Sequence, residues 1–193
     1  MNLADIKKYY IDSFNDLREA RKPLLIAVII FLAGIVFGLT YPWHGEGLLS
    51  ALKGLARQLS GKSLPFLILT IFFRNSLSAA ISIGLGPFLG IVPILGAVTN
   101  GLLVGTVLSH IRETDKINAI LQLIPHGIFE LPAIFIAWGL GIWQGIWFLQ
   151  KNVDHSLKER RHKAFRIFFI ILIPLLLIAA TIEGMSIYII RMK

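Results

Sequence analysis

The sequence predicts an all-α protein: a bundle of about five membrane-spanning helices, with two amphipathic helices lying along the membrane surface. Three observations predict this fold. Apolar residues make up 55% of the 193 residues, and the mean hydropathy of the chain is +0.73, values typical of membrane proteins. Five apolar runs are each long enough to cross a bilayer. No segment between them is long enough for a soluble domain, so a single integral membrane domain is expected over residues 1–193.

The first predicted helix, at residues 2–20, places apolar side chains at helical spacing with charged ones around them. This pattern is typical of a helix lying along the membrane surface, and equally of a solvated arm packed on the rest of the protein. Residues 45–62 place leucines on one face and basic residues elsewhere, and they are too few and too polar to span. We expect a second surface helix there.

The spanning helices are predicted from apolar runs, the first of which has basic residues at its entry and aromatic residues at its exit. Residues 84–93, between the second and third spans, hold three glycines, two prolines and no charge. They predict a tight apolar hairpin or a re-entrant turn. The expected spans cover about residues 24–41, 64–83, 94–110, 123–149 and 167–190.

The formal charge of +8 comes from 19 Lys and Arg against 11 Asp and Glu. In a membrane protein basic loops record which side of the membrane they occupy, so membrane lipids are expected partners and nucleic acid is not. Five basic residues precede the first span and six lie in residues 150–166, against seven on the other side. This bias favours a multi-pass protein of the cell membrane with a cytoplasmic N-terminus. The absence of cysteine excludes disulfides and thiolate metal sites.

Small and aromatic residues within the spans predict how the helices pack. Trp143 and Trp147 stand four residues apart and share a helix face, and both are expected at the membrane interface, where tryptophan is enriched. Glycines at GxxxG spacing favour close packing within one bundle over dimerisation, although association of copies of the chain stays open. The four pairs are Gly34/Gly38, Gly86/Gly90, Gly101/Gly105 and Gly141/Gly145.

Polar side chains inside the spans form the candidate site. Charge at such depth is costly, so each charged group should be paired or hydrated. With about 1.5 Å of rise per residue, the alternating spans bring these residues into one layer of the outer half of the membrane. We expect Arg74 to compensate Glu130 or Glu183, while the others fill the remaining hydrogen-bonding demand. The polar cluster comprises Arg74, Asn75, Asn100, His126, Glu130 and Glu183.

Three interpretations of the polar cluster remain open. It is a structural network that fixes which helices touch, a site for an ion or small solute, or an intramembrane metal or acid/base centre. His126 and Glu130 stand four residues apart and share a helix face, and with Glu183 they would offer three metal ligands. The chain lacks the second histidine of the H-E-x-x-H motif. No catalytic residue is therefore predicted, and no cofactor is expected unless these three residues hold a metal ion.

The second to fourth spans carry segments in a recognisable order: FFRNS at residues 72–76, TNG at 99–101, PHGIFELPA at 125–133 and GLG at 139–141. They resemble the stage II sporulation protein M family of integral membrane proteins over about residues 65–149. The resemblance implies about five spans. The founding member of that family acts as the membrane partner of two cell-wall-degrading proteins and is not itself the hydrolase. The resemblance makes a similar role one expectation for this chain. The family motif falls on Asn75, Asn100, Gly101, His126, Gly127, Glu130 and Pro132.

The leading functional expectation is therefore non-enzymatic. It is a membrane scaffold, or a partner of other membrane or cell-envelope proteins, held together by the polar cluster. The first alternative is a small ion or solute transporter or channel component that uses the cluster as its binding site. The second alternative is an intramembrane metal-dependent hydrolase. A scaffold requires a sealed cluster, a transporter requires a water-connected cavity, and a hydrolase requires metal about 2 Å from His126.

Overall fold

The computed structural model describes the backbone of residues 3–59, 61–111, 113–149 and 156–192, and their side chains except those of 3–6, 56, 113–126 and 190–192. Within these ranges the chain is almost entirely helical and contains no strand. Five of the described helices are long and apolar enough to cross a membrane. The predicted all-α membrane fold is confirmed.

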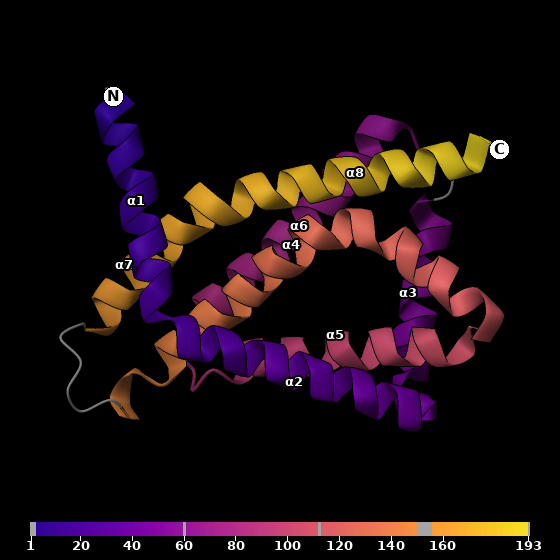
Figure 1. Ribbon diagram of the computed structural model, residues 1–193, viewed down its shortest axis with the longest axis horizontal. Coiled ribbons are helices and arrows are strands. Elements are labelled where there is room, and N and C mark those ends of the chain that lie inside the picture. The colour runs from indigo at the N-terminus through magenta and orange to yellow at the C-terminus, as the bar shows by residue number, and fades with distance from the viewer. Residues whose placement is uncertain (1–2, 60, 112, 150–155, 193) are drawn as a thin grey trace.

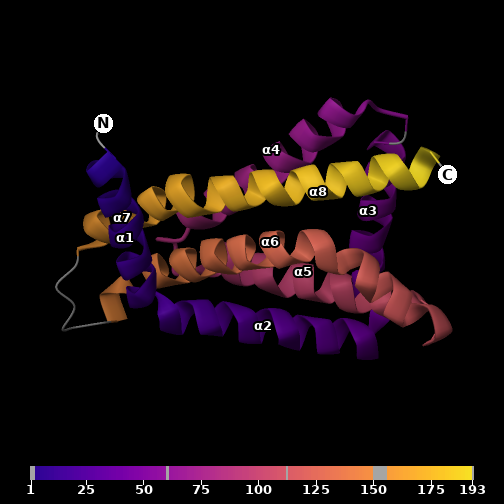
Figure 2. The same cartoon turned by 45° about the horizontal axis from the view of Figure 1, so that its top comes forward.

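The helices and short turns follow one another along the chain with brief connections. The turns η1 and η2 are 3₁₀ turns, and η3 is a π turn that joins α7 and α8 into one long helix. The spanning helices run back and forth, and the N- and C-termini lie at opposite ends (Figures 1 and 2). The elements are α1 Leu3–Glu19, α2 Arg21–Thr40, η1 Pro42–Gly45, α3 Glu46–Leu59, α4 Leu64–Gly84, α5 Ile91–His110, α6 Glu113–Gly145, η2 Trp147–Leu149, α7 Leu157–Ile167, η3 Phe168–Leu172 and α8 Ile173–Met192.

Helix α6 is the centre of the bundle. It contacts α2 and α5, which pack against each other, and also α4 and α8, which form a second packed pair. Its sequence explains this position, because Ala133, Ala137, Gly141 and Gly145 form a strip of small residues at helical spacing, and all four are buried. Small side chains let neighbouring backbones approach closely. Each half of the bundle is therefore built against the same central helix.

The α2–α5 contact is made by glycines. Gly34 and Gly38 of α2 lie directly against Gly101 and Gly105 of α5. A Cβ atom on Gly34 would lie 2.8 Å from the carbonyl oxygen of Val98, closer than real Cβ contacts. The two backbones therefore touch, and the expectation that these GxxxG pairs pack within one bundle is confirmed.

The other two glycine pairs meet each other as well. Gly141 and Gly145 of α6 lie against Gly86 and Gly90 of the turn between α4 and α5. Gly90 has φ +67°, a left-handed conformation that suits glycine. The N–H of Gly90 donates to the carbonyl oxygen of Gly86 at 2.9 Å, which closes the turn. Of the two predicted forms, the structure therefore has the tight hairpin.

Helices are present at both positions where surface helices were predicted, and these helices, α1 and α3, lie at opposite ends of the bundle (Figure 1). In both views α1 and α3 run across the direction of the spanning helices (Figures 1 and 2), as helices lying along a membrane surface would. The Nε2 atom of His110, at the end of α5, lies 3.1 Å from Oε1 of Glu46, at the start of α3. Helix α1 packs on α7, and its residues Ser13 and Asp16 are buried.

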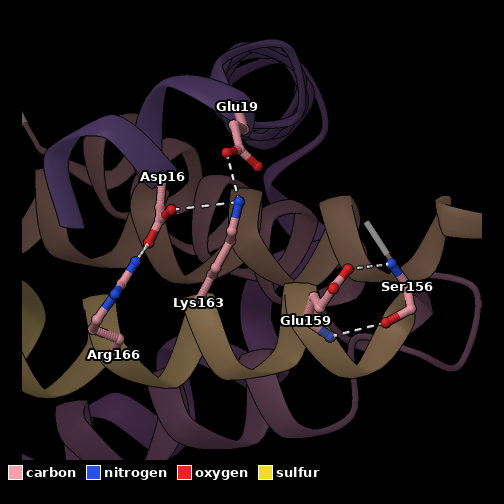
Figure 3. A network of polar contacts seen from close by, with 6 residues as sticks. All are labelled: Asp16, Glu19, Ser156, Glu159, Lys163 and Arg166. Atoms are coloured by element: carbon pink, nitrogen blue, oxygen red, sulfur yellow. Dashed lines mark hydrogen bonds and ion pairs between the residues drawn. The ribbon is translucent and has the colours of Figure 1, made fainter. Parts of the chain in front are cut away.

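The segment expected as a loop before the last span is partly helical. Helix α7 begins after Ser156, whose hydroxyl accepts a hydrogen bond from the backbone N–H of Glu159. The Glu159 carboxylate in turn accepts from the Ser156 N–H at 2.7 Å (Figure 3). These two reciprocal hydrogen bonds form a capping box, a typical signature of a helix N-terminus. Residues 150–155 lie outside the described chain.

Helix α6 also differs from the expected fourth span of residues 123–149. It begins at Glu113 and ends at Gly145. Its backbone stays helical through Pro125 and Pro132, although proline removes a helical hydrogen bond. The expected start at residue 123 followed from the polar segment before it, residues 112–118, and from the preference of proline, here Pro125, for the first turn of a helix. A helix can extend beyond the bilayer, so hydropathy marks the span and not the helix.

The π turn η3 lies just before a proline. The N–H of Ile173 donates to the carbonyl oxygen of Phe168, five residues earlier. Pro174 follows and has no N–H to continue the regular pattern. The helix therefore widens by one residue here and then continues as α8.

Ion pairs join α1 to α7. The carboxylate of Asp16 contacts the guanidinium of Arg166 and lies 3.5 Å from Nζ of Lys163 (Figure 3). Lys163 Nζ also donates to Oε1 of Glu19 at 2.6 Å. The side chains of Asp16 and Lys163 are only 9% and 17% exposed. Partial burial weakens screening by solvent and salt, so this network, the α1–α7 clasp, holds the N-terminal helix in place.

Removing one charge from the clasp should loosen α1. We expect Asp16→Asn to lower the free energy of opening α1 by about 1–2 kcal/mol, because two cations lose a partly buried partner. Amide hydrogen exchange of α1 in nanodiscs measures this directly. Asp12→Asn, on the same helix and outside the clasp, is the matched control. Equal exchange rates in the two variants would show that the clasp does not hold the helix.

Candidate functional site

The polar cluster is centred on Glu130 of α6. Its Oε1 atom accepts a hydrogen bond of 3.0 Å from Nδ2 of Asn75, on α4. The bond links residues 55 positions apart in the chain and joins the central helix to its neighbour within the membrane. Hydrogen bonds of this kind gain strength from the low dielectric of their surroundings.

A second acid approaches from α8. Glu183 lies close enough to Glu130 for the two carboxyl groups to interact electrostatically. Two carboxylates at this range repel each other. The geometry therefore gives Glu130 one helix partner, Asn75, and one like-charged neighbour.

A cavity adjoins Glu130 on the side of α2 and α5. Its volume is about 280 Å³. Asn100 of α5 also lines it, and the Asn100 amide donates to the carbonyl oxygen of Gly96 at 2.8 Å. The remaining walls are apolar. The residues that line this Glu130 pocket are Phe31, Ile35, Asn100, Val104, Gly127, Glu130, Leu131, Ile134 and Trp138.

Arg74 does not occupy the place that the sequence suggested. It was expected to pair with Glu130 or Glu183, but among the described side chains no ion pair links it to an acid. Successive residues of a helix point about 100° apart. Because Asn75 faces α6, the Arg74 side chain turns instead into a groove between α4 and α5, where it is exposed.

This α4–α5 groove is larger than the Glu130 pocket and more open. Its volume is about 420 Å³. Polar groups contribute only part of its wall, and leucine, isoleucine and valine contribute most of the rest. The groove is lined by Arg74, Leu77, Ser78, Ile81, Ser82, Val92, Leu95, Gly96 and Thr99.

The side chain of His126 lies outside the described part of the structure, so its expected place in the cluster stays a prediction. The metal set of His126, Glu130 and Glu183 stays a prediction for the same reason. Among the side chains that are described, no three His, Cys, Asp or Glu residues come together as ligands for a metal.

Two buried polar residues near the α7 end of α6 were not singled out from the sequence. The amide of Gln144 donates to the carbonyl oxygen of Ile83, on α4, at 3.0 Å. Arg160 of α7 donates from Nη1 to the carbonyl oxygen of Trp143 at 2.7 Å, and its guanidinium lies 5.0 Å from the centre of the Trp143 ring. Both side chains are fully buried. Arg160 had been counted only as part of the basic cluster that sets orientation.

The position of Arg160 in the sequence indicates that it is buried, because it shares a helix face with apolar residues. Arg160, Ala164 and Ile167 recur at helical intervals and are all buried. Of the two tryptophans expected at the interface, Trp147 is exposed, whereas Trp143 is only 3% exposed, and Trp138 is buried as well. The expected interfacial position of Trp143 was therefore wrong, because its ring packs inside the bundle.

The fold and these buried polar contacts define an integral membrane protein with several spanning helices. The family model of stage II sporulation protein M matches residues 27–186. This match covers most of the chain, and the protein belongs to that family. Comparisons with curated proteins and with solved structures find no match.

Proposed function

We propose that this protein is a non-enzymatic membrane scaffold that holds partner proteins of a cell-envelope complex. One observation carries the proposal: polar groups of α6 bond to other helices of the same chain. Glu130 accepts from Asn75 of α4, Gln144 donates to α4, and the carbonyl of Trp143 accepts from Arg160 of α7. Such bonds brace the helices against one another. A braced bundle offers partners a surface of fixed shape.

Membership of the sporulation family supports this role, since the resemblance implies that its founding member is a membrane partner of other envelope proteins. We further propose that the α1–α7 end faces the cytoplasm. The described basic residues of α1 and α7 lie at this end, where the two helices contact each other. In the sequence, five basic residues precede the first apolar run and six lie in residues 150–166, against seven in the segments expected on the other side. Basic segments near the membrane are enriched on the cytoplasmic side.

The experiment compares Glu130→Gln with Glu130→Ala in protein extracted from native membranes with a mild detergent. Glutamine keeps an oxygen that accepts from Asn75, whereas alanine removes it. A scaffold predicts that Glu130→Gln keeps both its thermal stability and its bound partner chains, as weighed by native mass spectrometry. It predicts that Glu130→Ala loses about 1–3 kcal/mol of stability.

A second candidate function is the binding of an ion or small solute, and the Glu130 pocket favours it. The pocket places a carboxylate beside a cavity at membrane depth. A carrier requires the charge of Glu130, so Glu130→Gln would abolish solute flux into liposomes while leaving the fold intact. Wild-type protein that extracts without partner chains and shows such a flux would overturn the scaffold proposal.

A further inference from the structure

Arg74 lies at an energetically demanding position. It is near the middle of α4, which runs from Leu64 to Gly84 as one of the spanning helices. The guanidinium keeps its charge in proteins, and an arginine at the centre of a bilayer costs about 3 kcal/mol or more unless it is paired or hydrated. Within the described side chains no acid pairs with it. Its charge therefore calls for an anion that the described side chains do not supply.

The α4–α5 groove has the form of a site for an amphiphile. Arg74, Ser78 and Thr99 supply its polar part, and Leu77, Ile81, Val92 and Leu95 supply its apolar part, which continues toward the turn between the two helices. A volume of about 420 Å³ falls within the range of small-molecule sites, about 300–1,000 Å³.

The groove opens toward the surroundings of the bundle and not toward its core. Leu77, Ile81 and Leu95 are 46%, 43% and 55% exposed, and Phe88 in the adjoining turn is 66% exposed. Exposed apolar side chains on spanning helices face lipid chains. A ligand that enters this groove therefore comes from the bilayer.

We propose that the α4–α5 groove binds an anionic phospholipid, with its phosphate paired to Arg74 and an acyl chain lying along Leu77, Ile81 and Leu95. The planar guanidinium fork matches the oxygens of a phosphate and binds them in a bidentate manner. The site uses neither Glu130 nor the partner proteins of the scaffold. This lipid site goes beyond the proposed function, and the two proposals are tested independently of each other.

The depth of Arg74 distinguishes this lipid from the lipids that merely surround the bundle. At about 1.5 Å per residue, its Cα lies about 15 Å from either end of α4. The long side chain can reach part of this distance toward the surface. The phosphate that it binds would still lie below the level of the bulk head groups, so exchange with bulk lipid would be slow.

The test is native mass spectrometry of delipidated protein in detergent, titrated with equal amounts of dioleoyl phosphatidylglycerol and dioleoyl phosphatidylcholine. These lipids share their chains and differ in net charge. We expect wild-type protein to retain one phosphatidylglycerol with a preference on the order of tenfold, equivalent to about 1.4 kcal/mol. Arg74→Gln should bring the preference to parity, and Arg74→Lys should restore part of it.

Two further variants separate the groove from general charge effects. Ser78→Trp keeps Arg74 but fills the groove, and it should abolish retention of the lipid. Lys53→Gln removes an exposed cation of α3, outside the groove, and should leave the preference unchanged. Thermal melts of each variant establish that it is folded.

Three results would overturn the proposal. The first is equal retention of the two lipids by wild-type protein. The second is displacement of phosphatidylglycerol by millimolar inorganic phosphate, which would make the groove a site for a free anion. The third is a change of oligomeric state in Arg74→Gln with the lipid preference intact, which would place an acid of a second copy against Arg74.

Discussion

Gly101→Val is expected to destabilise the protein by about 3 kcal/mol or more, a loss at the upper end of what overpacking costs. A Cβ atom on Gly101 would collide with the main-chain carbonyl oxygen of Phe31, on α2. A side chain could rotate away from such a contact, but a carbonyl oxygen within a helix cannot. The two helices must therefore separate, and the remaining glycine contacts along them are lost together. Thermal unfolding in detergent, followed by circular dichroism, measures the effect.

The matched control is Gly84→Val, at the end of α4. Nothing lies within 4 Å of the position that a Cβ would take there. The same substitution in another spanning helix should therefore change stability by less than about 1 kcal/mol. If the two variants unfold at the same temperature, the α2–α5 backbones are not in the close contact described above.

The second large effect is expected for Arg160→Met, with a loss of about 3 kcal/mol. The methionine side chain fills much of the same space but donates no hydrogen bond. The carbonyl oxygen of Trp143 then loses a buried charged donor, and the ring of Trp143 loses its cation. Hydrogen bonds to charged groups contribute about 1.5–3 kcal/mol, and a desolvated cation over an indole ring adds to this. Urea unfolding in detergent gives the difference.

Arg161→Met serves as the control on the same helix. The guanidinium of Arg161 lies 5.9 Å from the ring of Phe165, but the residue is exposed. We expect its replacement to change stability by less than about 0.5 kcal/mol. Comparable losses of stability in both variants would mean that α7 stabilises the protein through its net charge and not through the buried contact of Arg160 with Trp143.

Much of the fold follows from the sequence because its signals are local. Apolar length predicts the spanning helices, since every backbone group in a bilayer must bond within the helix. The glycine spacing in α2 and α5 predicts close packing, because only glycine lets two backbones touch. The extent of α6 beyond its apolar run is harder to predict, since hydropathy marks the segment that crosses the membrane and not the point outside it where the helix begins.

The sequence predicts the depth of each polar residue in the membrane, but it does not predict which neighbouring helix each side chain faces. Counting residues along α4 places Arg74 and Asn75 at one level with Glu130, and the bond between Asn75 and Glu130 joins two members of the predicted layer. Which of the two neighbours faces α6 depends on the rotation of α4 about its own axis. That rotation is set by packing against α6 and α8, which a single sequence does not display. The burial of Arg160 is not indicated by composition, because a basic cluster next to a span is already explained by membrane orientation.

The π turn between α7 and α8 has a consequence for the length of the last helix. Before the turn, buried residues such as Arg160 and Ile167 recur at helical spacing along one face. After the turn, buried residues such as Leu172 and Leu176 recur at the same spacing, but the pattern is displaced by one residue. Each residue corresponds to about 100° of rotation. Deleting one residue within Phe168–Leu172 would leave a regular helix that still crosses the membrane, yet it would swing Glu183 away from Glu130. The number of residues in this segment is therefore constrained independently of how apolar they are.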